Sequence, residues 1–181
     1  MTPEQLFEHH YIGMHKVARE QGWGDPTSYA RSREIFAAIK LGHTVSITYS
    51  GADAYNAQGQ PVEYKSTVGP QCQGSYTGIS VKPTWEEQEV YLREVKIGKY
   101  PEHYYNRFDD EGLAESWVMD GQIVLDTLMP KLKNQFYSPK KKADPRLGAS
   151  ITNTEIQKYG KKVFSRDSDI QKGEIKCRNK F

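Results

Sequence analysis

Polar and hydrophobic positions in the first forty residues recur with the spacing of helices. Pro3, directly after a threonine, suits the first position of a helix, which we expect over about residues 2–21. A second helix is expected over about residues 28–42, because Ile35 and Ile39 fall on one side of it and a glycine ends it. The chain therefore opens with two helices.

From residue 44 onward the pattern changes to short apolar runs separated by turn-forming residues. These runs predict strands near residues 44–49, 60–68 and 76–81. A turn of acidic residues and glycine inside 103–119 predicts a hairpin there. The strands alternate with helical segments, which is typical of an α/β (α+β) fold.

Three later segments have helical patterns. Thr84 opens a capping-box pattern, and the helix that follows is expected to reach about Lys96. A last core helix is expected around residues 123–132 and to be interrupted by Pro130. A short helix is expected to begin at Asn153.

The strand expected over 60–68 carries the most informative residues. Side chains alternate faces along a strand, so Glu63 and Lys65 point the same way while Tyr64 points the opposite way. Asp53 lies at the end of the preceding apolar run, and the glycine-containing connection 56–59 would fold one strand back on the other. We therefore expect Asp53 beside Glu63 and Lys65.

This arrangement is suited to metal-dependent hydrolysis. Two carboxylates offer the hard oxygen ligands that Mg²⁺ prefers, and a nearby ammonium group can orient a water molecule. The Glu-x-Lys spacing also occurs at 94–96 and 174–176, but only Glu63 and Lys65 combine it with a strand, an upstream aspartate and a tight connection. The alternative is a charge pair on a solvated sheet face.

The pattern of Asp53, nine residues, then Glu63-Tyr64-Lys65 resembles the active-site motif of the PD-(D/E)XK nucleases. The sequence of residues 51–60 is most similar to the corresponding segment of PvuII-like type II restriction endonucleases. Ala52 stands where the motif has its proline, a residue that contributes no ligand. The expected order of elements also matches the αβββαβ order of this superfamily, whose core is a mixed β-sheet flanked by helices.

The resemblance implies a Mg²⁺-dependent, sequence-specific endonuclease that hydrolyses phosphodiester bonds of double-stranded DNA. Asp53 and Glu63 would bind the metal, with the backbone carbonyl of Tyr64 as a further ligand. Lys65 would position the attacking water. Glu34 on the second helix is a further catalytic candidate, because some enzymes of the superfamily use a glutamate there; the alternative is a solvated helix face.

Charge is distributed unevenly along the chain. Residues 1–130 hold 11 Lys and Arg against 18 Asp and Glu, a net charge of −7, whereas residues 131–181 hold 14 against 5, a net charge of +9. A basic C-terminal third is typical of a surface that contacts a phosphate backbone, and the alternative is a solvated tail.

Two segments are candidate DNA contacts. Polar side chains after the catalytic strand could read base edges in the major groove, and these are Gln71, Gln73, Ser75 and Tyr76. In the basic third, cations would neutralise phosphates and two amides could contact adenine; the residues are Lys133, Asn134, Gln135, Lys140, Lys141, Lys142 and Arg146. A basic loop without a partner is the alternative for the second segment.

Length and composition indicate one nuclease domain over residues 1–181. It would comprise N-terminal helices (about 2–41), a catalytic core (about 44–132) and a basic DNA-contacting segment (about 131–181). No apolar run reaches membrane-spanning length, no secretory signal opens the chain, and the two cysteines lack metal-ligand spacing, which favours a reducing cytoplasm.

A palindromic DNA site calls for two-fold symmetry, so we expect a homodimer formed through the N-terminal helices. Two alternatives belong to other functional classes. One is a structure-selective, homing or nicking DNA endonuclease of the same superfamily. The other is a non-catalytic DNA-binding module, which would bind DNA with a steep salt dependence and without metal-dependent turnover.

Overall fold

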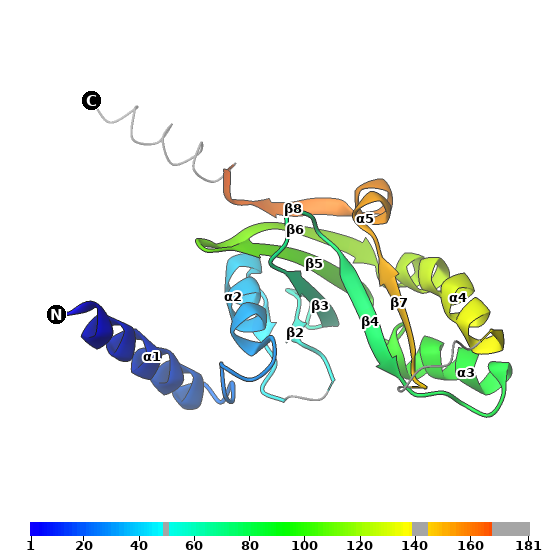
Figure 1. The fold of residues 1–181 in the computed structure, drawn as a ribbon, viewed down its shortest axis with the longest axis horizontal. Helices are drawn as coiled ribbons and strands as arrows, with labels where there is room; N and C mark the ends of the chain where they lie inside the picture. The colour runs from blue at the N-terminus through cyan, green and yellow to red at the C-terminus, as the bar shows by residue number, and fades with distance from the viewer. Residues whose placement is uncertain (49–50, 139–144, 168–181) are drawn as a thin grey trace. The chain divides into compact units, whose positions relative to one another are not determined.

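The computed structural model describes residues 1–48, 51–138 and 145–167 (Figure 1). The chain divides into two compact units, Met1–Pro61 and Val62–Phe181. Helices and strands occur in both units, which confirms the α+β class expected from the sequence. Within the described ranges, no helix is both long enough and apolar enough to cross a bilayer.

Two helices open the first unit, as predicted. Helix α1 (Pro3–Glu20) begins with a complete capping box, in which the Thr2 hydroxyl accepts from the Gln5 backbone N–H and the Gln5 side chain accepts from the Thr2 N–H. Helix α2 (Arg31–Leu41) ends at Gly42, whose φ of 70° is the left-handed conformation that glycine adopts most readily.

Strand pairing in the first unit differs from the prediction. Strand β1 is only Thr44–Val45 and pairs antiparallel with β2 (Ala54–Tyr55), so Asp53 immediately precedes a strand instead of ending the run 44–49. The Ser46 hydroxyl bonds to Thr48, accepting from its backbone N–H at 3.3 Å, and this local bonding competes with an extended ladder.

The connection after β2 is a tight turn, as expected. The Asn56 side-chain oxygen accepts hydrogen bonds from the backbone N–H groups of Gln58 (3.1 Å) and Gln60 (2.9 Å). Gly59 has a φ of 75°, which a side chain would strain. The turn fixes the chain reversal between Asp53 and the strand that carries Glu63.

The second unit contains a mixed sheet of strands in the order β3 (Pro61–Thr67), β5 (Glu102–Asp109), β6 (Gly112–Asp120) and β8 (Lys161–Ser165). Strands β3 and β5 are parallel, and the other two pairings are antiparallel. Directly paired residues share a face, so Glu63 lies beside His103 and Lys65 lies beside Tyr105.

A separate two-stranded ribbon joins β4 (Gly74–Ile79) to β7 (Leu147–Ile151). Helix α4 (Gly121–Tyr137) lies beside this ribbon in Figure 1, and it also contacts α3 (Trp85–Tyr91). Helix α3 continues into a π-helical turn, η1 (Leu92–Lys96), and α5 (Asn153–Tyr159) follows β7. The buried core of this unit gathers side chains from all of these elements, including Tyr76, Trp85, Tyr105, Leu128 and Ile156.

Helix α4 passes through Pro130 without ending, so the predicted interruption is wrong. Leu125 and Leu128 before the proline and Leu132 after it are all buried in the same core. Burial of one continuous apolar face outweighs the loss of a single backbone hydrogen bond.

Candidate functional site

Strand β3 has the alternation that the sequence predicts. Val62 and Tyr64 are buried, whereas Glu63 and Lys65 are partly exposed. The Tyr64 ring packs edge-to-face on Tyr104, with 5.7 Å between centroids, on the face opposite Glu63. Burial of the Tyr64 face fixes which way the acidic and basic residues of this strand point.

Glu63 and Lys65 form an ion pair in which the Lys65 ammonium donates directly to the Glu63 Oε1. Only 18% of the Glu63 side chain and 21% of the Lys65 side chain are exposed. The ammonium also lies 4.9 Å from the centre of the Tyr76 ring, within the range of a cation–π interaction. A partly buried pair of this kind is held more rigidly than a charge pair on a solvated sheet face.

In the first unit, Asp53 and Glu34 line the same pocket. Its volume is about 290 Å³, and its other lining residues are Ser28, Tyr29, Arg31 and Thr48. Two carboxylates in one cavity beside a guanidinium group make an environment suited to a cation or a polar ligand. The two catalytic candidates of this unit are therefore brought together.

Arg31 orients Glu34 in this pocket. The arginine is almost fully buried; its Nε donates to the Trp23 carbonyl at 2.9 Å, and another guanidinium nitrogen donates to the Ser46 carbonyl. Its Nη1 lies 3.2 Å from Glu34 Oε2. Glu34 thus has a fixed partner, which a glutamate on a solvated helix face lacks. Arg31 was not among the residues predicted from the sequence, where its only signal was an arginine three residues before a candidate carboxylate.

The candidate DNA contacts after β3 separate into two groups. Gln71, Gln73 and Ser75 are exposed at alternating positions, and the Ser75 hydroxyl lies 3.1 Å from that of Ser150 on β7. Tyr76 is only 6% exposed, so the prediction that it contacts DNA is corrected: its side chain belongs to the core. The alternation of β4 places Tyr76 on the buried face.

The candidate DNA contacts of the basic segment also differ in exposure. Lys133 and Asn134 are exposed on α4, and the Lys133 ammonium lies 5.4 Å from the centre of the Trp85 ring. The Gln135 side-chain oxygen instead accepts from the backbone N–H of Gly148 at 2.7 Å, so this amide anchors β7. Arg146 is exposed, with its guanidinium against Gly78; Lys140, Lys141 and Lys142 lie outside the described residues.

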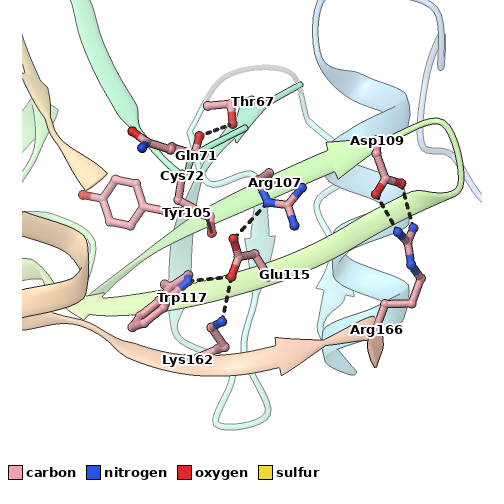
Figure 2. Close-up of polar contacts among 10 residues, drawn as sticks. All are labelled: Thr67, Gln71, Cys72, Tyr105, Arg107, Asp109, Glu115, Trp117, Lys162 and Arg166. Atoms are coloured by element: carbon pink, nitrogen blue, oxygen red, sulfur yellow. Dashed lines mark hydrogen bonds and ion pairs between the residues drawn. The ribbon is translucent and has the colours of Figure 1, made fainter. Parts of the chain in front are cut away.

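A further polar network on the same sheet was missed by sequence analysis. Figure 2 shows Glu115 between Arg107 and Lys162, at 2.9 Å and 2.8 Å, with the Trp117 indole N–H at 3.3 Å. Partial burial acts to raise the pKa of Glu115, but these donors lower it to about 2. The acidic turn of the hairpin was the signal that could have identified this network. The position of the turn sets the register of β5 and β6, and this register pairs Arg107 with Glu115.

Cys72 has no features of a reactive thiol. It is buried, its Sγ lies 3.7 Å from the Tyr105 carbonyl, and it forms no disulfide in the described part of the chain. Burial raises the pKa of this thiol to about 12. Cys177 lies outside the described residues.

Within the described ranges, no three His, Cys, Asp or Glu side chains converge as a ready-made metal cluster. The motif expected from the sequence requires only two carboxylates and a carbonyl oxygen. The described candidate residues are the Glu63–Lys65 ion pair on β3 in the second unit and, in the first unit, the pocket lined by Asp53 and Glu34. Neither protein-family models nor curated proteins match this chain. Its own geometry therefore carries the functional argument.

Proposed function

We propose that this chain is a Mg²⁺-dependent, sequence-specific endonuclease of double-stranded DNA, of the type II restriction class. The observation that carries the proposal is the pairing of Glu63 and Lys65 on one face of β3, partly buried and braced by the Tyr76 ring. An acid and a base held together in this way suit the hydrolysis of a phosphodiester bond better than a structural charge pair does.

The donors that the sequence motif supplies are of the chemical type that the metal of this reaction takes. Asp53 and Glu63 supply carboxylate oxygens, and the Tyr64 carbonyl supplies a third oxygen, all of the hard type that Mg²⁺ prefers. When bound, Mg²⁺ lowers the pKa of water and neutralises charge on the phosphate. Lys65 would orient the attacking water and stabilise the negative charge that develops. Glu34, held by Arg31, would accept a hydrogen bond from water in the pocket it shares with Asp53.

DNA contacts are proposed on two exposed surfaces of the second unit. Gln71, Gln73 and Ser75 offer both donors and acceptors, as readout of base edges requires. Lys133, Asn134 and Arg146 would contact phosphates or base edges from α4 and the start of β7. Gln135 joins α4 to β7 by accepting a hydrogen bond from the backbone N–H of Gly148.

Homodimerisation through α1 is part of the proposal. Phe7, Tyr11 and Met14 are spaced to share one helix face, and all three are exposed, Phe7 by 73%. The first half of the helix carries Glu4 and Glu8, whereas the second half carries Lys16 and Arg19 together with Glu20 and is net positive. Antiparallel pairing of two copies about a two-fold axis would place opposite charges together.

The dimer has a direct test. Phe7→Glu is expected to give a monomer by light scattering, whereas Ile12→Glu is the matched control. Ile12 is exposed on the same helix but lies five residues from Phe7, about 140° around the axis. A wild-type chain that is monomeric with and without DNA would overturn this part of the proposal.

Cleavage of unmodified DNA tests the main proposal. Purified protein is incubated with a sequenced plasmid, with Mg²⁺ or with EDTA, and discrete bands are expected only with Mg²⁺. Lys65→Ala is expected to abolish cleavage and to retain DNA binding. Lys96→Ala is the matched control, because Glu94 and Lys96 have the same spacing on the exposed surface of η1. Wild-type cleavage by Lys65→Ala would overturn the assignment.

The other outcomes identify the alternatives. Nicking, or cleavage that depends on DNA branching instead of sequence, would indicate a structure-selective or nicking endonuclease of the same superfamily. Salt-sensitive DNA binding without any Mg²⁺-dependent turnover would indicate a non-catalytic DNA-binding module.

A further inference from the structure

Three buried side chains form a hydrogen-bonded series behind Lys65. The Tyr76 hydroxyl on β4 lies 2.8 Å from His103 Nδ1 and 3.0 Å from the Tyr105 hydroxyl, both on β5. His103 Nε2 lies 3.3 Å from the carbonyl oxygen of Ile97, directly after η1. His103 and Tyr105 are completely buried, and Tyr76 is nearly so.

The direction of every hydrogen bond in this series follows from its ends. His103 is completely buried, and burial favours the uncharged ring, which carries one proton. A carbonyl oxygen only accepts, so that proton is on Nε2 and Nδ1 accepts from the Tyr76 hydroxyl. The Tyr76 oxygen must then accept from Tyr105. Two directed hydrogen bonds therefore hold the phenol oxygen of Tyr76.

The fixed ring of Tyr76 is the surface on which the Lys65 ammonium rests, 4.9 Å from its centre. The aliphatic part of the same lysine is also confined. A methyl group at Gly74 would lie 3.1 Å from Lys65 Cγ and would overlap the Tyr105 ring. Lysine side chains are otherwise among the most mobile, so a neighbour on both the stem and the charged end restricts Lys65 to few conformations.

We propose that Tyr76 is a positioning residue, whose ring is locked by His103 and Tyr105 and holds the Lys65 ammonium beside Glu63. For the reaction, this inference rests on the proposed endonuclease function; for the placement of Lys65, it does not. A flexible lysine would have to be ordered during each turnover, whereas Tyr76 orders it beforehand. The effect of Tyr76 is therefore expected on kcat more than on KM.

Two substitutions distinguish the contribution of the Tyr76 ring from that of its hydroxyl group. Tyr76→Leu removes the ring face and is expected to lower kcat about tenfold or more with little change in KM. Tyr76→Phe keeps the ring face and is expected to retain most of the activity, so the conservative variant rescues the loss. Phe108→Leu is the matched control, because it removes a buried ring from β5 on the opposite side of the sheet.

A measurement without DNA tests the geometry alone. In protein labelled with ¹³C-lysine, the methylene resonances nearest the Lys65 ammonium are expected to be shifted upfield by the ring current of Tyr76, and Lys65→Met identifies them. The shift is expected to persist in Tyr76→Phe and to disappear in Tyr76→Leu. A wild-type spectrum without the shift would overturn the proposal, whether or not Tyr76→Leu folds.

The two proposals fail in distinguishable ways. If Tyr76→Leu loses the shift yet cleaves DNA as fast as the wild type, while Lys65→Ala is inactive, Tyr76 is not a positioning residue and the endonuclease assignment stands. If Lys65→Ala cleaves normally and the shift is present, the endonuclease site is wrong and the contact between Lys65 and Tyr76 is structural.

Discussion

Replacement of Glu115 by glutamine tests whether the charge network of the sheet stabilises the second unit. Glu115 accepts hydrogen bonds from Arg107, Lys162 and Trp117 (Figure 2), and 19% of its side chain is exposed. Glu115→Gln keeps the shape of the side chain and removes its charge. The two cations then face a neutral amide, and the attraction that lowers the pKa of Glu115 is lost.

The size of the effect follows from linkage. The pKa of Glu115 is about 2 in the folded chain, against 4.5 for an unperturbed glutamate. A carboxylate with a lowered pKa stabilises the folded state above its unfolded pKa, and the contribution is lost as pH falls toward the folded pKa. The difference between the two pKa values corresponds to at most about 3–4 kcal/mol, and solvent at the edge of the network reduces it to roughly 1–2 kcal/mol.

Urea unfolding at several pH values provides the assay. The free energy of unfolding of Glu115→Gln is expected to be lower than that of the wild type at about pH 7, and the difference is expected to vanish as pH falls from about 4.5 to about 2. Glu111→Gln is the matched control, because Glu111 pairs with Arg166 at 3.5 Å but is 72% exposed. A difference that stays constant with pH would refute an electrostatic origin.

Two further predictions concern the lysine site and the DNA surface. Gly74→Ala is expected to lower the melting temperature and to reduce cleavage, because the new methyl group would displace Tyr105 or Lys65. The expected destabilisation of the folded state by overpacking is about 1–3 kcal/mol. Unchanged melting and activity would contradict this reasoning. Arg146→Ala is expected to reduce the slope of log DNA affinity against log salt concentration by about one, whereas Arg93→Ala, an exposed arginine of η1 that pairs with Glu89, is expected to leave the slope unchanged. Equal slopes in the wild type and both variants would remove Arg146 from the DNA surface.

Local signals in the sequence predicted much of the fold. The capping box at Thr2 and the left-handed Gly42 define helix ends through interactions within a few residues, so their positions needed no tertiary information. The alternation along β3 likewise predicted that Glu63 and Lys65 share a face. The structure brings these two residues together on β3, and it brings Asp53 and Glu34, also identified from the sequence, together in one pocket of the first unit.

Features that depend on distant partners were not predictable in the same way. Tyr76 is one of several polar residues after β3, and only the pairing of β4 with β7 and the packing of β4 on β5 determine that its face is buried. The early end of β1 depends on side-chain hydrogen bonds that compete with strand pairing. In the sequence, Pro130 predicts the end of a helix. Only the folded structure shows that the leucines before and after it are buried in one core, which allows the helix to continue.

In the π-helical turn η1, the number of residues matters more than their side chains for the direction of the backbone that follows. The backbone N–H of Ile97 donates to the Leu92 carbonyl five residues earlier, and this wide turn directs the Ile97 carbonyl toward His103. Deleting one residue would restore ordinary helical spacing and rotate the following backbone by about 100°. Relatives of this protein are therefore expected to differ freely at the exposed residues of η1 and to have no insertions or deletions there.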